Sequence, residues 1–509
     1  MSPQVATLIF AIGIIALFVL DRDPKGRTSF ALLIPMTWLA IGGSRVVSQW
    51  LNPTEQASAS SVGSAYMEGN PIDRTIQAVL MMIGMIVLVR RSQKLWQLLR
   101  ANGPILLFLL YCGASTLWSD FPEVAFRRWI KALGDLVMVL VVLTDPDRSA
   151  ALKLPARVGF LLIPLSILFM KYYPHLARGF DEIGGSEYTG VATSKNSLGM
   201  ICLIFGLGSV SRFLDAYRSE DRAEQTGKLI VHSTIIALAM WLFLWAHSMT
   251  SLFCFIFAVG LLVATGFPAV ARSPLKVHAL VAVIILGSFA VLFLGVGGGL
   301  LETVGRNASL TGRTEIWELV LPMAENPFFG TGFESFWLGQ RLERMLSIYR
   351  GINQAHNGYI EVYLNLGWAG IALLAIVLKT GYRNICDTLR GDSDAGRLML
   401  AYFVIGVVIN FTEASFKMMS PVWVFFLLAV MAVPKVSQRF GTRTSNNVLG
   451  KEAVGEHVVS PSRVRLSKTP FLTVRGLLCS ELAAMHRRGG SGNVQIRRWG
   501  GFPLGRLTV

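Results

Sequence analysis

The sequence predicts an all-α, polytopic membrane protein, a helical bundle with about 12–13 transmembrane helices and one large periplasmic loop containing short helices. Of its 509 residues, 53% are hydrophobic and only 15% are charged, and the mean hydropathy is +0.53. Soluble domains carry roughly a quarter charged residues. Apolar runs near the ~20 residues that cross a bilayer recur along most of the chain. These observations together indicate a chain built mainly of membrane spans.

The apolar runs give about 13 candidate spans. The first run follows no charged residue and lacks a convincing small-residue cleavage site, so it is predicted to be a retained span and not a signal peptide. Several runs are short or contain charges. The candidate spans are residues 5–20, 28–43, 75–89, 103–118, 129–144, 156–171, 196–211, 229–246, 250–267, 277–296, 358–378, 398–411 and 418–434.

The basic segments between the runs set the orientation. If the spans alternate across the bilayer, all of these segments fall on one side, which the positive-inside rule assigns to the cytoplasm. The long loop 297–357 then faces the periplasm. The predicted domains are a membrane domain over 1–434 and a basic, largely disordered cytoplasmic tail over 435–509 that contacts anionic lipid heads. The basic segments are 21–27, 90–100, 212–228, 271–276 and 379–397.

The net charge of +16 is explained by these loops and the tail, and no nucleic-acid partner is expected. The five cysteines lie in apolar runs or basic segments, so the sequence predicts no disulfide framework. It contains no CxxC or His-x-His grouping for a metal and no GxxxxGK[ST] loop for ATP. Neither a metal nor another cofactor is predicted.

The long periplasmic loop is where chemistry is expected. Its stretch "SLTGRTEIWELVLPMAEN" (309–326) predicts an amphipathic helix, capped by Ser309 or Thr311 and ended by Pro327, before the Gly-rich turn "PFFGTGFESFW". The apolar face of this helix comprises Ile316, Leu319, Val320 and Met323.

Two arginines of this loop, Arg306 and Arg313, are candidates for binding an anion. Arg313 falls in the first turn of the predicted helix, where the helix dipole disfavours a cation unless an anion is nearby. The planar guanidinium fork suits phosphate, because it donates two parallel hydrogen bonds. The alternative is that both arginines are surface charges, or that they pair with glutamates of the same loop, Glu302, Glu315 and Glu334.

His356 and Asn357 stand at the lip of the span that follows the loop. An imidazole can accept a proton from a hydroxyl at physiological pH, and the Asn357 amide can hold a sugar hydroxyl or orient the ring. The alternative is that His356 caps the helix beginning at Gly358 or lies at the wet interface. Further candidates at span ends are Lys195 and Asn196, although a lysine there often only snorkels. Glu413, an acid at membrane depth, is a functional candidate because ionisable groups are costly there.

Four segments together resemble the O-antigen ligase and polysaccharide polymerase family. They are "TGVATSKNSLG", "STLWSDFPEVAFRRWIKAL", "LTGRTEIW…NPFFGTGFESFW" and "AHNGYIEVYLNLGWAGIALL". The resemblance covers roughly residues 100–435, is carried most specifically by the Gly-Arg-Thr and His-Asn pairs, and is nearest to exopolysaccharide polymerases.

The resemblance implies a bacterial inner-membrane enzyme that needs no metal or nucleotide sugar. It implies an undecaprenyl-pyrophosphate-linked oligosaccharide as donor, a glycan or lipid acceptor, membrane lipids as surroundings, and other polysaccharide export proteins as partners. Arg313 matches the family arginine that binds pyrophosphate, and His356 matches the histidine near the acceptor hydroxyl. The candidate substrate-binding residues are Arg306, Lys195, Asn196, Asn357, Glu315, Tyr359 and Glu413.

One position departs from the family pattern. Many members carry a Lys or Arg where this chain has Met249, within "HSMTS". Lys195, Arg306 or Arg178 are the candidates to replace that cation. Two other functions stay open on the sequence: a ligase that joins glycan to lipid A core or protein, and a lipid-linked glycan flippase. A flippase should carry mid-membrane ionisable groups and repeated halves.

Overall fold

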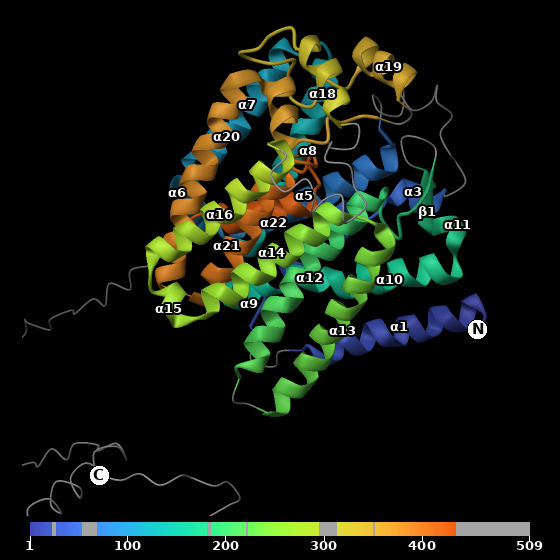
Figure 1. The fold of residues 1–509 in the computed structure, drawn as a ribbon, viewed down its shortest axis with the longest axis vertical. Helices are drawn as coiled ribbons and strands as arrows, with labels where there is room; N and C mark the ends of the chain where they lie inside the picture. Colours follow the sequence, from blue (N-terminus) through green and yellow to red (C-terminus); the bar gives the residue numbers. More distant parts are fainter. Residues whose placement is uncertain are drawn as a thin grey trace, which may run out of the picture. The chain divides into compact units, whose positions relative to one another are not determined.

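The computed structural model describes residues 1–22, 27–52, 69–180, 185–219, 222–294, 313–349, 352–391 and 393–433. All of them belong to one compact unit, Met1–Val436. This part of the chain is almost entirely helical (Figure 1), so the predicted all-α class is confirmed. Its strands are a short antiparallel pair, β1 (Arg178–Phe180) and β2 (Ser186–Tyr188). The predicted tail, 435–509, lies outside the described residues.

The helices follow one another with short connections. The first group is α1 (Pro3–Leu20), η1 (Phe30–Leu32), α2 (Leu33–Gly42), α3 (Val47–Leu51), α5 (Pro71–Arg90), α6 (Ser92–Ala101), α7 (Gly103–Ala114), η2 (Ser115–Trp118) and α8 (Pro122–Leu143). The second group is α9 (Arg148–Lys153), η3 (Pro155–Val158), α10 (Gly159–Tyr172), α11 (Pro174–Ala177), α12 (Lys195–Tyr217), α13 (Arg222–Ala246), α14 (Met249–Gly266), α15 (Pro268–Ala271) and α16 (Pro274–Phe293). The last group is α18 (Arg313–Val320), η4 (Leu321–Met323), α19 (Gly339–Ile348), α20 (Gly358–Gly391), α21 (Ser393–Ile409) and α22 (Pro421–Val430).

Every predicted span overlaps a helix, but not every one is long enough to cross a bilayer alone. Among the described residues, 8 helices are sufficiently long and apolar, or up to 9 if α6 and α7–η2, which meet at a bend of 86°, count as one span. The remaining predicted spans fall on η1–α2, α8, α21 and α22. These helices are shorter or more polar, because they serve the interior of the bundle.

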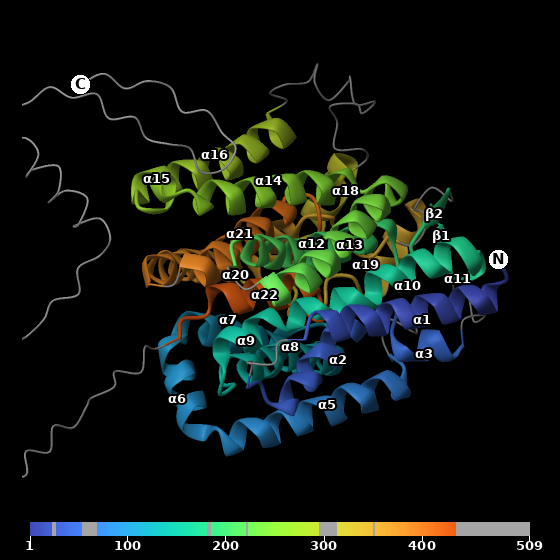
Figure 2. The ribbon, with the colours of Figure 1, turned by 90° about the horizontal axis from the view of Figure 1, so that it is seen from below.

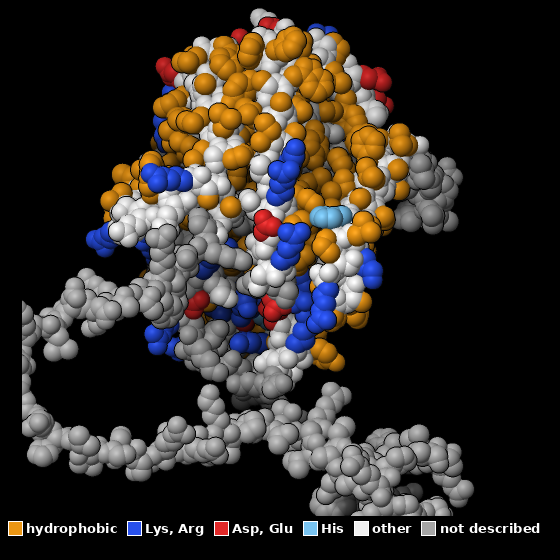
Figure 3. Space-filling model, turned by 90° about the vertical axis from the view of Figure 1, so that its left-hand side faces the viewer, with side chains coloured by type: hydrophobic (Ala, Val, Ile, Leu, Met, Phe, Trp, Pro, Cys, Tyr) orange, Lys and Arg blue, Asp and Glu red, His pale blue; other side chains and the backbone are white. Residues whose placement is uncertain are grey.

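Burial separates central helices from lipid-facing ones. Every residue of α22 is buried, as is most of α12, and helices that are apolar all round belong in the core of a bundle. In contrast, the apolar windows of α1 and α16 are only 6% and 11% buried. Figure 2 shows α5 and α16 along opposite edges of the bundle. Figure 3 shows one face largely covered by hydrophobic side chains, with charged side chains gathered toward its lower part, as expected of a surface that meets lipid tails.

Candidate functional site

The loop before α20 is held against that helix by backbone hydrogen bonds. The helix is broken at Gly367, whose φ of 63° and ψ of −164° are not helical. A Cβ atom at Gly367 would lie 2.3 Å from the carbonyl carbon of Phe328, so only glycine allows this close approach. The freed amides of Trp368 and Ala369 bind the carbonyls of Pro327 and Phe328 at 2.8 and 3.1 Å.

Two buried polar side chains of α20 complete the docking of this loop. The Asn365 Oδ1 atom accepts hydrogen bonds from the amides of Ser335 and Phe336 at 2.9 and 3.0 Å. The Glu361 carboxylate accepts from the Trp337 indole at 3.0 and 2.9 Å. The predicted Gly-rich turn is therefore present, and its role is to fix the loop on the first two turns of α20.

The predicted amphipathic helix is α18, and it begins at Arg313. Its apolar face is confirmed, since Ile316 and Val320 are buried. The predicted end at Pro327 is wrong. Helix α18 stops at Val320 and passes into the 3₁₀ turn Leu321–Met323, because Pro322 has no amide to donate to the preceding turn. The predicted caps, Ser309 and Thr311, lie outside the described residues.

Arg313 finds its anion within the chain itself. Its Nη2 atom lies 2.6 Å from Oε1 of Glu413, and its Nη1 atom donates to the Thr412 carbonyl. Glu413 belongs to the loop between α21 and α22, and its residue is 3% exposed. Arg313 thus pairs with a carboxylate 100 positions away and not with the loop glutamates that the sequence offered as alternatives.

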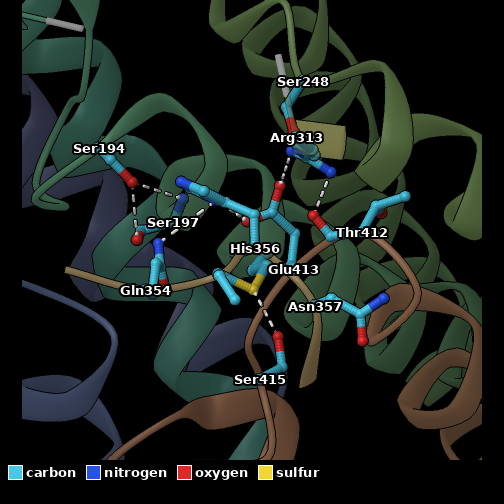
Figure 4. Close-up of polar contacts among 12 residues, drawn as sticks. Ser194, Ser197, Ser248, Arg313, Gln354, His356, Asn357, Thr412, Glu413 and Ser415 are labelled. Atoms are coloured by element: carbon cyan, nitrogen blue, oxygen red, sulfur yellow. Dashed lines mark hydrogen bonds and ion pairs between the residues drawn. The ribbon is translucent and has the colours of Figure 1, made fainter. Parts of the chain in front are cut away.

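His356 lies on the other oxygen of the same carboxylate. Its Nδ1 atom is 3.5 Å from Oε2 of Glu413 and 3.5 Å from Nε2 of Gln354. Its backbone has a φ of 50°, a conformation that costs free energy for a residue with a side chain and that persists only where the surroundings enforce it. Figure 4 shows Arg313, Glu413 and His356 converging from three separate segments.

The charge state of Glu413 follows from these neighbours. Burial alone would raise the pKa of its carboxyl, but the Arg313 guanidinium and the hydrogen bond to His356 hold that pKa below its ordinary value. The carboxylate is therefore ionised at neutral pH. An ionised carboxylate on Nδ1 favours the tautomer that keeps the proton there and the lone pair on Nε2, and it stabilises the imidazolium that forms when Nε2 takes a proton.

A polar cavity of about 210 Å³ adjoins Glu413. Gln354 and Glu413 form one side, and the first turn of α12 forms another, where Ser194 caps the helix by accepting from the Ser197 amide at 3.2 Å. Lys417 reaches the cavity as an exposed cation and donates to Gln354 Oε1 at 3.1 Å. Lys417, Gln354 and His356 are therefore linked along one wall (Figure 4 shows the latter two).

Other residues predicted for the site take structural positions. Asn196 does line the cavity. Lys195 instead pairs with Glu187 at 3.3 Å, at the start of α12. Glu315 accepts from the Tyr349 hydroxyl at 3.3 Å on the outer side of α18. Arg306 lies outside the described residues.

Asn357 and Tyr359 serve the backbone. Asn357 Oδ1 accepts from the amides of Tyr359 and Ile360 at 2.9 and 3.0 Å, so Asn357, and not His356, caps α20. Its Nδ2 atom donates to the Phe411 carbonyl at 3.1 Å. The Tyr359 hydroxyl donates to the Val407 carbonyl at 3.0 Å. Both residues thereby join α20 to α21, and their polar atoms point away from the cavity.

Lys417 and Gln354 were missed by the sequence reasoning. Lys417 stands in the short outward segment before α22, four residues after Glu413, where the positive-inside rule makes a cation unusual. That position was the available signal. Gln354, two residues before His356, carried none. In the described part of the chain, no three His, Cys, Asp or Glu side chains are grouped as metal ligands.

The fold and site define a multi-pass membrane protein with a buried Arg–Glu–His constellation beside a polar cavity. Residues 233–375, which include Arg313 and His356, match the O-antigen ligase family, and the family resemblance predicted from the sequence is thereby confirmed. The chain is 25% identical over 290 residues to the exopolysaccharide production protein ExoQ of Rhizobium meliloti (strain 1021). That similarity covers 55% of this chain and 64% of the relative, just under two thirds of its length.

Proposed function

We propose that this protein is a bacterial inner-membrane glycosyltransferase that polymerises exopolysaccharide or O-antigen repeat units at the periplasmic face. The donor is an oligosaccharide linked to undecaprenyl pyrophosphate, and the acceptor is a hydroxyl of a second glycan. The observation that carries the proposal is the convergence of Arg313, Glu413 and His356 beside a polar cavity. The match to the O-antigen ligase family and the likeness to ExoQ support it.

The reaction is a displacement at the anomeric carbon. The acceptor oxygen forms a bond to C1 of the donor sugar as the bond from C1 to the pyrophosphate oxygen breaks, and undecaprenyl pyrophosphate leaves. His356 takes the proton of the attacking hydroxyl, with Glu413 holding the ring and stabilising the imidazolium. The lipid pyrophosphate supplies the energy of the transfer.

The two cations have different tasks in this proposal. Arg313 is committed to Glu413 and to the Thr412 carbonyl, so it sets the position and charge of the carboxylate while facing a donor phosphate with its remaining donors. Lys417 meets the cavity directly and binds a phosphate oxygen as a point charge. It takes the place of the cation that the family pattern expects at Met249.

The central test is His356→Ala. We expect the purified variant, given lipid-linked repeat units in detergent, to lose transfer by about 10²–10⁴-fold, the usual contribution of a positioned base. In cells, lipid-linked repeat units should accumulate at normal protein level. The matched control is His175→Ala, on the exposed turn α11, which should behave as wild type. Polymer of normal length from His356→Ala would refute the proposed base.

A second test concerns the guanidinium. Arg313→Lys should lower transfer at least about tenfold, because an ammonium cannot donate in parallel to Glu413 and the Thr412 carbonyl. Arg272→Lys, at an exposed helix end, is the control. The same assay separates the alternatives: products longer by whole repeat units indicate polymerisation, and transfer only to lipid A core or protein indicates ligation.

A further inference from the structure

We propose that a second cavity, at the opposite end of the bundle from the candidate site, binds a zwitterionic phospholipid of the phosphatidylethanolamine class. This cavity has a volume of about 630 Å³ and is lined by α9 and by parts of α12, α20, α21 and α22. Its size lies within the roughly 300–1,000 Å³ of typical ligand sites. The Arg–Glu–His constellation contributes no residue to it.

The height of the cavity in the bundle points to a lipid. Helix α12 begins at Lys195, beside the candidate site, and runs 23 residues to Tyr217, beside the second cavity. At 1.5 Å per residue this is about 34 Å. The hydrocarbon core of a bilayer is about 30 Å thick. When the candidate site lies at one surface of the membrane, the second cavity therefore lies at the headgroup level of the opposite leaflet.

The inner wall of the cavity is apolar and is kept open by small residues. Tyr402, Phe425 and Leu428 form much of it, and the Tyr402 hydroxyl is already used, since it donates to the Ile204 carbonyl at 3.2 Å. A Cβ atom at Gly208 would lie 2.5 Å from Cβ of Ala156. Because these surfaces offer little to a sugar or a nucleotide, they suit the first methylenes of acyl chains.

The rim carries charges of both signs in equal number. Lys153 and Asp215 pair at 3.4 Å with side chains 41% and 29% exposed, so the pair is open and its partners can be exchanged for a ligand. Arg212 is already bound to Asp21 at 2.8 Å. The cations are Arg148, Lys153 and Arg212, and the acids are Asp215, Asp387 and Asp394.

This balance selects the headgroup. A phosphate can bind the Lys153 side of the rim while an ammonium group binds Asp387, whose side chain is 73% exposed. A headgroup with phosphate alone would bring its charge against three acids, which disfavours phosphatidylglycerol and cardiolipin. The ligand that satisfies both the apolar wall and the two signs of charge is a phospholipid with an amine.

The test is native mass spectrometry of the full chain, delipidated in detergent and offered equal amounts of phosphatidylethanolamine, phosphatidylglycerol and cardiolipin. We expect one retained phosphatidylethanolamine per protein. Ser149→Trp, which fills the exposed rim, should abolish retention, and its control is Ser233→Trp on the exposed side of α13. Soluble glycerophosphoethanolamine at the same concentration should not displace the lipid, because it lacks acyl chains.

Asp387→Asn gives a second variant on an exposed side chain, so folding is not at stake. It should lower retention of phosphatidylethanolamine roughly threefold relative to phosphatidylglycerol, the scale of one exposed charge pair. Equal retention of the three lipids by wild type, no retained lipid, or unchanged retention in both variants would overturn the proposal. None of these outcomes bears on His356→Ala, which tests the glycosyltransferase separately.

Discussion

Two carboxylates in this protein are each surrounded by arginine and histidine, at opposite ends of α12. Asp21 binds Arg157, Arg212 and His232 at 2.7, 2.8 and 3.1 Å. Glu413 binds Arg313 and His356 at 2.6 and 3.5 Å. The residue types are the same, but Asp21 is fully buried against its partners, whereas Glu413 lines a polar cavity.

The comparison teaches that composition does not decide the role of such a cluster. Asp21 ties the end of α1 to η3, α12 and α13, and two arginines use its lone pairs. Its burial would raise the pKa, but His232, Arg212 and Arg157 hold the pKa of Asp21 far below its ordinary value. Glu413 has only one arginine, a strained histidine and an adjoining cavity. We infer that the first cluster is a clamp and the second a reaction site.

The largest expected effect is that of Asp21→Ala. It leaves two arginines partly buried without their carboxylate, so the free energy of unfolding should fall by about 3–5 kcal/mol. Thermal aggregation of membrane extracts measures it. Transfer per folded molecule should stay within about twofold of wild type, the margin that a mutation far from the chemistry allows. Asp215→Ala, which breaks a half-exposed pair, is the control. Loss of activity in fully folded Asp21→Ala would erase the contrast between clamp and site.

Glu413→Gln should give the opposite pattern. Glutamine keeps a hydrogen-bond acceptor for Arg313 but removes the charge that stabilises the His356 imidazolium, so transfer should fall about 100-fold, or about 2.7 kcal/mol, with protein level preserved. Rates on purified protein with lipid-linked repeat units measure this, and Glu318→Gln on the exposed side of α18 is the control. An unchanged rate would mean that Glu413 is a second clamp.

Acid titration should sharpen the comparison further. Because the folded-state pKa of Glu413 is lowered, its contribution to stability is present above the ordinary value of 4.5 and is lost as the pH falls through the folded-state value. Wild type should therefore keep its melting temperature from pH 7 to 5 and lose it on further acidification. Glu413→Gln should show a shallower loss, by up to about 1.4 kcal/mol per pH unit. Parallel curves for the two proteins would contradict the assignment.

The smallest effect is expected for Lys195→Ala. Its pair with Glu187 is partly exposed, with side-chain exposures of 35% and 10%, so removal should cost less than about 1 kcal/mol. Transfer should change less than about threefold, whereas Lys417→Ala should lose about tenfold, the usual cost of one charge-assisted phosphate contact. The two lysines measured side by side show which one meets the substrate. A larger loss from Lys195→Ala would return it to the site.

The sequence predicted the helices well, because apolar length is a local property. The start of α18 at Arg313 and the buried face with Ile316 and Val320 followed from spacing alone. The partner of Arg313 did not, since Glu413 is 100 residues away and only the packing of α20 against α21 brings them together. Asn357 was misjudged for the opposite reason. Its backbone contacts are local, but an amide at a helix start reads equally well as a cap or as a ligand.

The break at Gly367 separates two demands on α20. The part before it, Gly358–Leu366, is bonded to the loop that carries the Gly-rich turn, while the part after it packs within the bundle as far as Gly391. The lower part can therefore be lengthened, shortened or re-tilted to match bilayers of different hydrophobic thickness without changing the register of the upper part. The lip that presents His356 keeps its geometry because it moves with the loop and not with the membrane-embedded shaft.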